Sequence, residues 1–331
     1  MFKKGFYSHI GANEPIVAGT INLGSTKGRG SSTRMFNYCN QNSANSSECI
    51  NQFITVKSTA SSQPTPTPPA SWSQLGPTGF NNQINTLAIG SDGKVYVGGF
   101  FTNGSNQRYV AVYDGSSWSQ LGTTGFTGSS GSINTLVIGS DGKVYVGGNF
   151  RNGSNERYVA VYDGTSWSQL GATGFNNVIN TLAVGSDGKV YAGGYFTGSG
   201  LFIVSVYDGS TWSQLGTTFS GEIYTLAIGS DGKVYAGGAF TNVFVYVPSN
   251  NSWTGTTGIT SPIYSLVIGS DGKVYAGGAI IFVYNGSTWS QLGTTGFNDQ
   301  IQELAIGSDG KVYAGGFFTN GTNEYYVAVY K

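Results

Sequence analysis

The hexapeptide Ser-Asp-Gly-Lys-Val-Tyr occurs six times in this 331-residue sequence, and this repetition limits the possible folds more than any other feature. Consecutive copies lie between 38 and 49 residues apart, and their aspartates are Asp92, Asp141, Asp187, Asp231, Asp271 and Asp309. Repeats of roughly 40 to 50 residues are typical of β-propellers, in which each repeat forms one blade of four strands. The spacing therefore predicts a propeller.

The first complete repeat contains four segments with the composition of β-strands, rich in Val, Ile, Tyr and Thr and bounded by Gly, Asp, Asn and Ser. We expect strands at 84–89, 94–101 and 108–113, and an outer strand around Trp118. Because Asp and Gly favour tight turns, residues 90–93 should connect the first two strands. No segment has a helical pattern of useful length, so the predicted fold class is all-β.

The positions of the tryptophans predict how the ring of blades closes. There is one for each repeat unit, and they are Trp72, Trp118, Trp167, Trp212, Trp253 and Trp289. Trp72 precedes the first complete unit, whereas Lys331 follows the third strand of the sixth unit. We therefore predict a six-bladed β-propeller over residues 71–331 that is closed by an N-terminal outer strand around Trp72, which removes the open sheet edges.

The segment Val95–Gly99 ends in a Gly-Gly pair and is followed by Tyr113 and then Trp118. This order resembles the kelch repeat, and all six units contain the Gly-Gly pair. It is also similar to the kelch-like repeats of bacterial, fungal and viral surface proteins. The resemblance covers residues 71–331 and implies a fold rather than a function, because propellers include both enzymes and binding proteins.

The composition excludes several functions. Only 10% of the residues are charged, the formal net charge is zero, and there are one His and two Cys. These counts exclude most metal sites and catalysis that depend on His or Cys, and they give no electrostatic argument for nucleic acid binding. Some kelch-like propellers are copper oxidases, but His9 and both Cys lie before the repeats, so the resemblance does not extend to that activity. We expect a protein that is not an enzyme and has no cofactor.

Two carboxylates leave an enzymatic alternative open. Glu222 and Glu303 lie near the starts of the inner strands of two different blades, where a pair of acids could serve a hydrolase or lyase. The alternative is that both are solvated loop carboxylates. Each Asp-Gly turn supplies a single acid, which favours a structural turn over a calcium site. Cys39 and Cys49 could form a local disulfide or stay free.

The loops between the second and third strands differ most among the repeats, and function in a repeated fold usually depends on such variable loops. They are long at 102–108, 151–157 and 319–325, in blades that are neighbours in a closed ring. The candidate ligand-binding residues in these loops are Asn103, Asn106, Arg108, Arg151, Asn152, Asn155, Arg157, Asn320 and Asn323. Arg and Asn together suit polar or acidic ligands, including sugars, and ordinary loop solvation is the alternative.

An apolar position also recurs in the connections between blades. Its members are Phe80, Phe126, Phe175, Phe219, Ile259 and Phe297. Because the position repeats in every blade, we expect it to pack between blades rather than to stack on glycans.

Residues 1–70 do not match the repeat and differ from it in charge. They contain six basic and two acidic residues, a net charge of +4, so the remainder of this neutral chain carries −4. We expect extended segments at 15–23 and 52–57. Residues 58–70 contain four of the eight prolines and should form an extended spacer. The predicted organisation is an anchor or docking segment at 1–57, this spacer, and the propeller at 71–331.

This layout resembles that of spike or decoration proteins, in which a tail docks into a shell and a head projects. We expect a structural or adhesion protein of a virion or other surface assembly, whose residues 1–57 bind other structural proteins of the assembly. The loop face would bind a glycan or protein receptor. A free soluble glycan- or protein-binding propeller is the alternative. The sequence contains no recognisable secretion signal and no transmembrane segment, and we expect neither nucleic acid binding nor membrane insertion.

Overall fold

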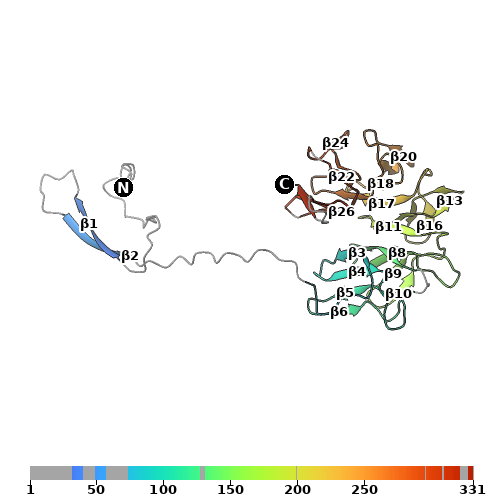
Figure 1. Cartoon of the computed structure of the whole chain (residues 1–331), viewed down its shortest axis with the longest axis horizontal. Coiled ribbons are helices and arrows are strands. Elements are labelled where there is room, and N and C mark those ends of the chain that lie inside the picture. Colours follow the sequence, from blue (N-terminus) through green and yellow to red (C-terminus); the bar gives the residue numbers. More distant parts are fainter. Residues whose placement is uncertain are drawn as a thin grey trace. The chain divides into compact units, whose positions relative to one another are not determined.

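The computed structural model describes residues 32–39, 49–56, 74–126, 131–198, 200–294, 296–307, 309–320 and 327–330 (Figure 1). The chain forms two compact units, Met1–Ser73 and Gln74–Lys331. No helix in these ranges is long and apolar enough to cross a membrane.

The first unit contains an antiparallel hairpin. Its strands are β1 (Ser32–Cys39) and β2 (Cys49–Val56), and the register places Cys39 opposite Cys49. The segment expected at 52–57 therefore forms most of a longer strand, and β1 was not predicted. The segment expected at 15–23 lies outside the described residues.

The second unit is a six-bladed β-propeller whose blades follow one another along the chain (Figure 1). Blade one contains β3 (Ile84–Ile89), β4 (Val95–Gly99), β5 (Ala111–Tyr113) and β6 (Trp118–Gln120). Blade two contains β7 (Ile133–Ile138), β8 (Val144–Gly148), β9 (Ala160–Tyr162) and β10 (Trp167–Gln169). Blade three contains β11 (Ile179–Val184), β12 (Val190–Gly194), β15 (Ser205–Tyr207) and β16 (Trp212–Gln214), with an added hairpin of β13 (Thr197–Gly198) and β14 (Leu201–Phe202).

The last three blades have the same antiparallel order. Blade four contains β17 (Ile223–Ile228), β18 (Val234–Gly238), β19 (Phe244–Val247) and β20 (Ser252–Gly255), with a short 3-10 helix at Pro248–Asn250. Blade five contains β21 (Ser265–Ile268), β22 (Val274–Gly277), β23 (Ile281–Tyr284) and β24 (Trp289–Gln291). Within the described ranges blade six contains β25 (Ile301–Ile306), β26 (Val312–Gly316) and β27 (Ala328–Tyr330). The predicted strand positions are confirmed, although the second and third strands of blade one are shorter than expected.

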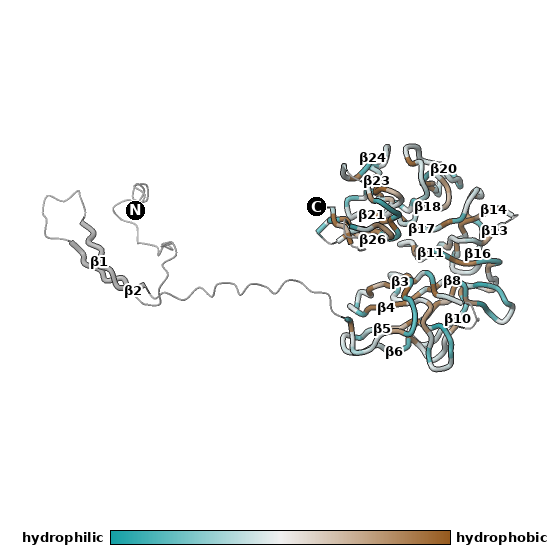
Figure 2. The backbone as a smooth tube through the Cα atoms, in the orientation of Figure 1, coloured by the Kyte–Doolittle hydropathy of each residue, from teal (hydrophilic) through white to brown (hydrophobic). Residues whose placement is uncertain are grey.

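The hydrophobic core lies between the blades rather than within them. Five of the buried clusters each combine residues of two consecutive blades, as when Tyr191 of blade three packs with Ile223 of blade four. Figure 2 shows that the hydrophobic residues, in brown, follow the strands, whereas the connecting turns are mostly teal or white. A single blade therefore lacks most of its core until its neighbour is in place.

Two hydrogen bonds repeat at the junction between blades. The Thr86 hydroxyl accepts the backbone N–H of Leu136 in the next blade at 3.1 Å, and Thr135, Thr181, Thr225 and Ser265 do the same in turn. At the outer edge, the Trp167 indole N–H donates to the carbonyl of Leu121 in the preceding blade at 2.7 Å. These bonds fix the relative position of successive sheets.

The Gly-Gly pair is required by close packing at the same junction. A Cβ added to Gly98 would lie 2.4 Å from Ile133 of the next blade, and one added to Gly99 would lie 2.1 Å from the Gln83 carbonyl oxygen. Neither distance is compatible with a side chain. Because the pair has no side chains, β4 can pack closely against the start of β3 in its own blade and against Ile133 of the next blade.

The Ser-Asp-Gly-Lys turns are built by their aspartates. The Asp92 carboxylate accepts the Lys94 backbone N–H at 3.1 Å and the Lys94 ammonium at 2.8 Å, while Gly93 takes a φ of 78° that favours glycine. All six turns carry this exposed Asp–Lys ion pair. Exposed pairs add little stability, so the main role of the aspartate is to shape the turn.

The turns between the third and fourth strands use a second set of aspartates. Backbone N–H groups of Ser117 and Ser116 and the Ser116 hydroxyl donate to Asp114, which lowers the pKa of its carboxyl from 3.8 to about 2. The Thr165 hydroxyl and two backbone N–H groups lower the pKa of Asp163 to about 2, and the Thr211 N–H is the main cause of the same value for Asp208.

Replacing these three aspartates by Asn should reduce the acid sensitivity of the propeller. Their lowered pKa means that they stabilise the folded state above the pKa of an unfolded Asp, and that this stability is lost as the pH falls from about 4 to about 2. Asn285 of blade five accepts the same hydrogen bonds, so the turn should survive the change. Urea unfolding from pH 6 to about pH 2 should therefore show a shallower loss of stability in the triple variant. An identical pH dependence in both proteins would contradict this account.

Blades one and six each expose an apolar face. Leu87 is 63% exposed, whereas its counterparts Leu136, Leu182, Leu226, Leu266 and Leu304 are buried against the preceding blade. Ile84 and Ile89 of blade one, and Val327 and Val329 of blade six, are also exposed. Trp72, around which the closing strand is predicted, lies outside the described residues. The Trp118 indole nevertheless donates to the Leu75 carbonyl, which places Leu75 beside blade one as Leu121 lies beside blade two.

The variant Trp72→Ala tests whether Trp72 completes blade six. If it does, the change should destabilise the full-length chain as much as Trp167→Ala, by about 2–3 kcal/mol, because both remove a packed indole from the outer edge of a blade. Denaturant unfolding followed by circular dichroism measures both. A neutral Trp72→Ala beside a destabilising Trp167→Ala would show that Trp72 does not close the ring.

Candidate functional site

The variable loops lie at one end of the blades. Because the strands are antiparallel, the loops between second and third strands share an end with the starts of the inner strands, opposite the Ser-Asp-Gly-Lys turns. We call this end the loop face. Its loops differ in structure: those of blades one and two are closed by bridges between Thr102 and Arg108 and between Arg151 and Arg157, while the loop of blade three forms the β13–β14 hairpin.

The asparagines predicted as ligand-binding residues shape these loops. The Asn103 side-chain Oδ1 accepts the backbone N–H groups of Ser105 and Gln107, and the Asn152 Oδ1 accepts the corresponding pair in blade two. Asn106 and Asn155 take φ values of 56° and 62°, which Asn tolerates better than most residues. Asn320 is exposed in the loop of blade six, and Asn323 lies outside the described residues.

Two of the three arginines connect the loops to neighbouring backbone. The Arg108 Nε donates to the Gly131 carbonyl at 2.6 Å, and the Arg157 Nε donates to the Asn149 side chain at 3.0 Å. Burial and the nearby Arg151 lower the pKa of Arg157. Arg151 donates within its own exposed loop, to the carbonyl oxygens of the Asn155 backbone and side chain. A structural role thus accompanies any role of Arg108 and Arg157 in binding.

A shallow cavity of about 320 Å³ brings two of the predicted residues together. Arg151 and Asn152 line it with Tyr158, Trp167 and Gln169. The Gln169 side-chain oxygen accepts the Asn152 amide at 3.0 Å, which orients that amide. The cavity thus combines a cation, amides and aromatic rings, which is the chemistry that a polar ligand with an apolar face would need.

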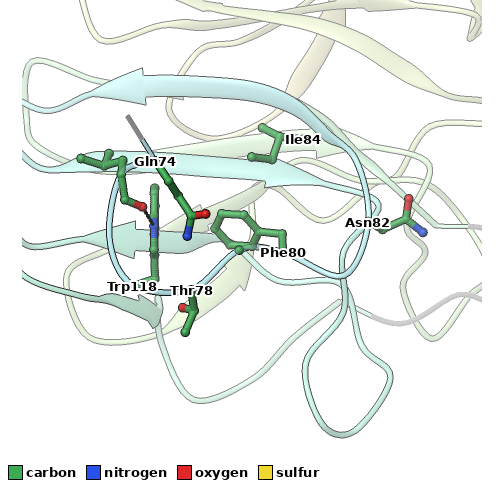
Figure 3. Close-up of a pocket in the computed structure, with 8 residues that line it drawn as sticks. Gln74, Thr78, Phe80, Asn82, Ile84 and Trp118 are labelled. Carbon is green, nitrogen blue, oxygen red and sulfur yellow. Dashed lines mark hydrogen bonds between the residues drawn. The ribbon is translucent and has the colours of Figure 1, made fainter. Parts of the chain in front are cut away.

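A second cavity of about 380 Å³ lies on blade one (Figure 3). Phe80, Ile84, Trp118 and Gln74 line it, and the Trp118 indole is held by its bond to the Leu75 carbonyl. It adjoins the exposed apolar face of blade one through Ile84.

The repeated apolar position in the connections between blades packs as predicted. Phe126, Phe175, Phe219 and Ile259 are buried. Phe126 meets the Trp167 ring edge-on at a centroid distance of 5.1 Å. The buried rings of Phe126, Phe175 and Phe219 therefore belong to the packing between blades and are not available as a glycan platform, whereas Phe80 and Phe297 are half-buried.

The two acids considered for catalysis occupy different positions in the repeat. Glu222 directly precedes β17, whereas Glu303 lies within β25 at the place where the other blades carry Thr or Ser. Desolvation raises the pKa of the Glu303 carboxyl. Their positions are therefore not those of a matched pair. No group of three or more His, Cys, Asp or Glu side chains in the described ranges is arranged to hold a metal ion.

An aromatic cluster around Glu222 was not predicted. Tyr195 follows β12, and the Glu222 carboxylate lies close enough to the hydroxyls of Tyr195 and Tyr224 to raise the pKa of both. The Tyr224 and Tyr264 rings stack with centroids 5.4 Å apart and planes 9° from parallel. The sequence contained a signal for this cluster, because these two tyrosines occupy the position where blades one to three have Asn.

Comparisons with known proteins support the propeller fold. The Rax2 C-terminal beta propeller domain matches residues 169–308, and the DUF5122 beta-propeller, a domain of unknown function, matches residues 90–112 and 139–160. No curated protein sequence matches the chain.

Many solved structures match this chain, and two of them illustrate the shared fold at low sequence identity. Virginiamycin B lyase from Staphylococcus aureus superposes with a TM-score of 0.58 and 12% identity, covering 76% of this chain and 86% of the lyase. The extracellular domain of a protein described as a one-component system of B. thetaiotaomicron gives 0.52 and 15%, covering 75% of this chain. This chain spans only 38% of that domain. Identities this low establish the fold alone.

The loop arginines should differ in their effect on stability. Arg108→Ala leaves the Gly131 carbonyl without its partly buried donor and should lower the free energy of unfolding by about 1–3 kcal/mol. Arg151→Ala removes bonds within an exposed loop and should change it by less than about 0.5 kcal/mol. Urea unfolding measures both values. A neutral Arg108→Ala, or an Arg151→Ala of equal cost, would show that the loops are not fixed in this way.

Proposed function

We propose that this chain is a non-enzymatic display protein, in which an N-terminal segment anchors a propeller that binds a receptor through its loop face. The anchoring segment docks onto structural proteins of a virion or other surface assembly, and the kelch-like repeats form the projecting head. The observation that carries this proposal is the division into two compact units, together with their opposite charges and the proline-rich spacer before the second unit.

Three further observations support a display role. The hairpin β1–β2 gives the N-terminal unit an ordered element that can dock as a strand pair. The Ser-Asp-Gly-Lys turns cover one end of the propeller with neutralised ion pairs, which favours solubility there. One of the proteins that shares the fold is an extracellular domain, which is consistent with a surface location.

A free soluble propeller that binds glycans or proteins is the second candidate. The cavity at Arg151 and Asn152, with Trp167 beside them, favours it because this binding chemistry does not require an anchor. A hydrolase or lyase is the third candidate and has the least support, because Glu222 and Glu303 occupy non-equivalent positions and the similarity to a lyase is at 12% identity.

Deletion of residues 1–57 tests the anchor. A tagged full-length chain expressed in its source cells should sediment with high-mass particles on a density gradient. The deletion variant should remain in the light fractions with an unchanged melting temperature. A matched control replaces residues 58–70 by Gly and Ser and should still sediment with particles.

The alternatives give different results. A deletion variant that still sediments with particles would show that the propeller does the docking. A full-length chain found only in the light fractions would favour the free soluble protein.

A further inference from the structure

One position on the inner strands departs from the repeat in two adjacent blades. In blades one to three it is Asn85, Asn134 and Asn180, and each side-chain amide donates to the backbone carbonyl of an Ile in the next blade, at 3.2 to 3.4 Å. In blades four and five the position is Tyr224 and Tyr264, whose rings stack on each other. These two blades have therefore exchanged a junction hydrogen bond for an aromatic pair, which the fold itself does not require.

Glu222 and Tyr195 place a carboxylate and a third ring at the same location. The backbone fixes both, since the Tyr195 N–H donates to Val178 at 2.9 Å and the Glu222 carbonyl accepts the Ala239 N–H at 2.9 Å. The Glu222 carboxylate lies close to the Tyr195 and Tyr224 hydroxyls, and this charge and burial raise the pKa of both tyrosines. Both phenols thus stay protonated beside the Glu222 side chain.

The cluster is accessible from the loop face. Tyr195 is 41% exposed, and Glu222, Tyr224 and Tyr264 are half-buried. A small ligand can therefore reach the Glu222 carboxylate and the exposed Tyr195 ring beside it. Half-burial also reduces solvent screening, which strengthens an electrostatic contact there.

No cation balances Glu222 in the part of the chain that the structure describes. The six ion pairs found there are all Asp–Lys pairs of the turns at the opposite end of the blades. The hydrogen bonds of Arg108, Arg151 and Arg157 are made in and beside the loops of blades one and two. The site therefore has a negative charge next to the electron-rich faces and oxygens of three phenols.

We propose that Tyr195, Glu222, Tyr224 and Tyr264 form a binding site for an organic ammonium group. Aromatic faces attract such cations through their quadrupole, and methylated ammonium groups are bound by aromatic rings in this way. The Glu222 carboxylate supplies the opposite charge. A neutral ligand would gain nothing from this charge, and an anionic ligand would be repelled by it. This proposal specifies the ligand class of the binding head and therefore rests on the proposed binding function of the propeller. It does not depend on the proposed anchor.

Choline and its neutral carbon isostere, in which carbon replaces the charged nitrogen, are the probes. Calorimetric titration of the full-length protein should show choline binding about tenfold more tightly than the isostere, because only choline gains the charge and cation–π terms. Glu222→Gln should weaken choline binding about tenfold, and Tyr264→Leu about fivefold. Glu156→Gln changes an exposed loop carboxylate without such a cluster and should leave choline binding unchanged.

Equal binding of choline and the isostere, or full choline binding by Glu222→Gln, would overturn the proposal. Melting temperatures monitor folding, and if Glu222→Gln does not fold, the comparison of choline with its isostere and the Tyr264→Leu variant still decide. Glucosamine and trimethyllysine, titrated in the same way, distinguish an amino sugar from a modified peptide as the source of the ammonium group.

The same titration separates this site from the anchor. Deleting residues 1–57 should leave choline binding intact, so a failed anchor with intact binding, or the reverse, identifies which proposal is wrong.

Discussion

The hydrogen bond from a backbone N–H of one blade to a Thr or Ser hydroxyl of the preceding blade is the contact on which the rest of the propeller depends. It lies on the inner strands, where Thr135, Thr181, Thr225 and Ser265 are buried. A buried hydroxyl without its partner would be costly, so each blade is satisfied only when the next one is in place. The Trp indole at the outer edge makes the complementary bond to the preceding blade. Together they align two sheets whose shared core neither could bury alone.

This uniform construction explains where the chain can vary. Between successive blades the inner strands are held by the junction hydroxyls and the outer tryptophans by their bond to the preceding blade, and the Ser-Asp-Gly-Lys turns are fixed by their own aspartates. On the loop face, by contrast, repeated contacts occur in some blades and not in others. The loop of blade three forms a hairpin that the loops of blades one and two lack. In blades four and five, the stacked tyrosines of the Glu222 cluster replace the asparagine that bonds to the next blade in blades one to three. Asymmetry on an otherwise symmetric ring is the physical basis for assigning binding to that face.

Much of the fold followed from sequence because its determinants are local and repeated. Strand composition, Asp-Gly turns and one Trp per unit each predict the same blade, and the structure agrees on their positions. The candidate site was harder to predict because side-chain partners come from different blades. The sequence gives no sign that Arg108 and Arg157 have hydrogen-bond partners, yet their side chains donate to the Gly131 carbonyl and the Asn149 side chain. The cluster at Glu222 combines residues 27 to 69 positions from Tyr195, and no local pattern brings them together. Strand β1 has few strand-forming residues, so its pairing with β2 could not be inferred from composition.

Native-state hydrogen exchange tests most directly the claim that successive blades depend on one another. The five amides that donate to the junction hydroxyls belong to Leu136, Leu182, Leu226, Leu266 and Leu304. If each blade is held by its neighbours, these amides should all exchange with one free energy, equal to that of global unfolding by urea. A series of distinct exchange free energies from blade to blade would show that the blades open independently and would contradict this account.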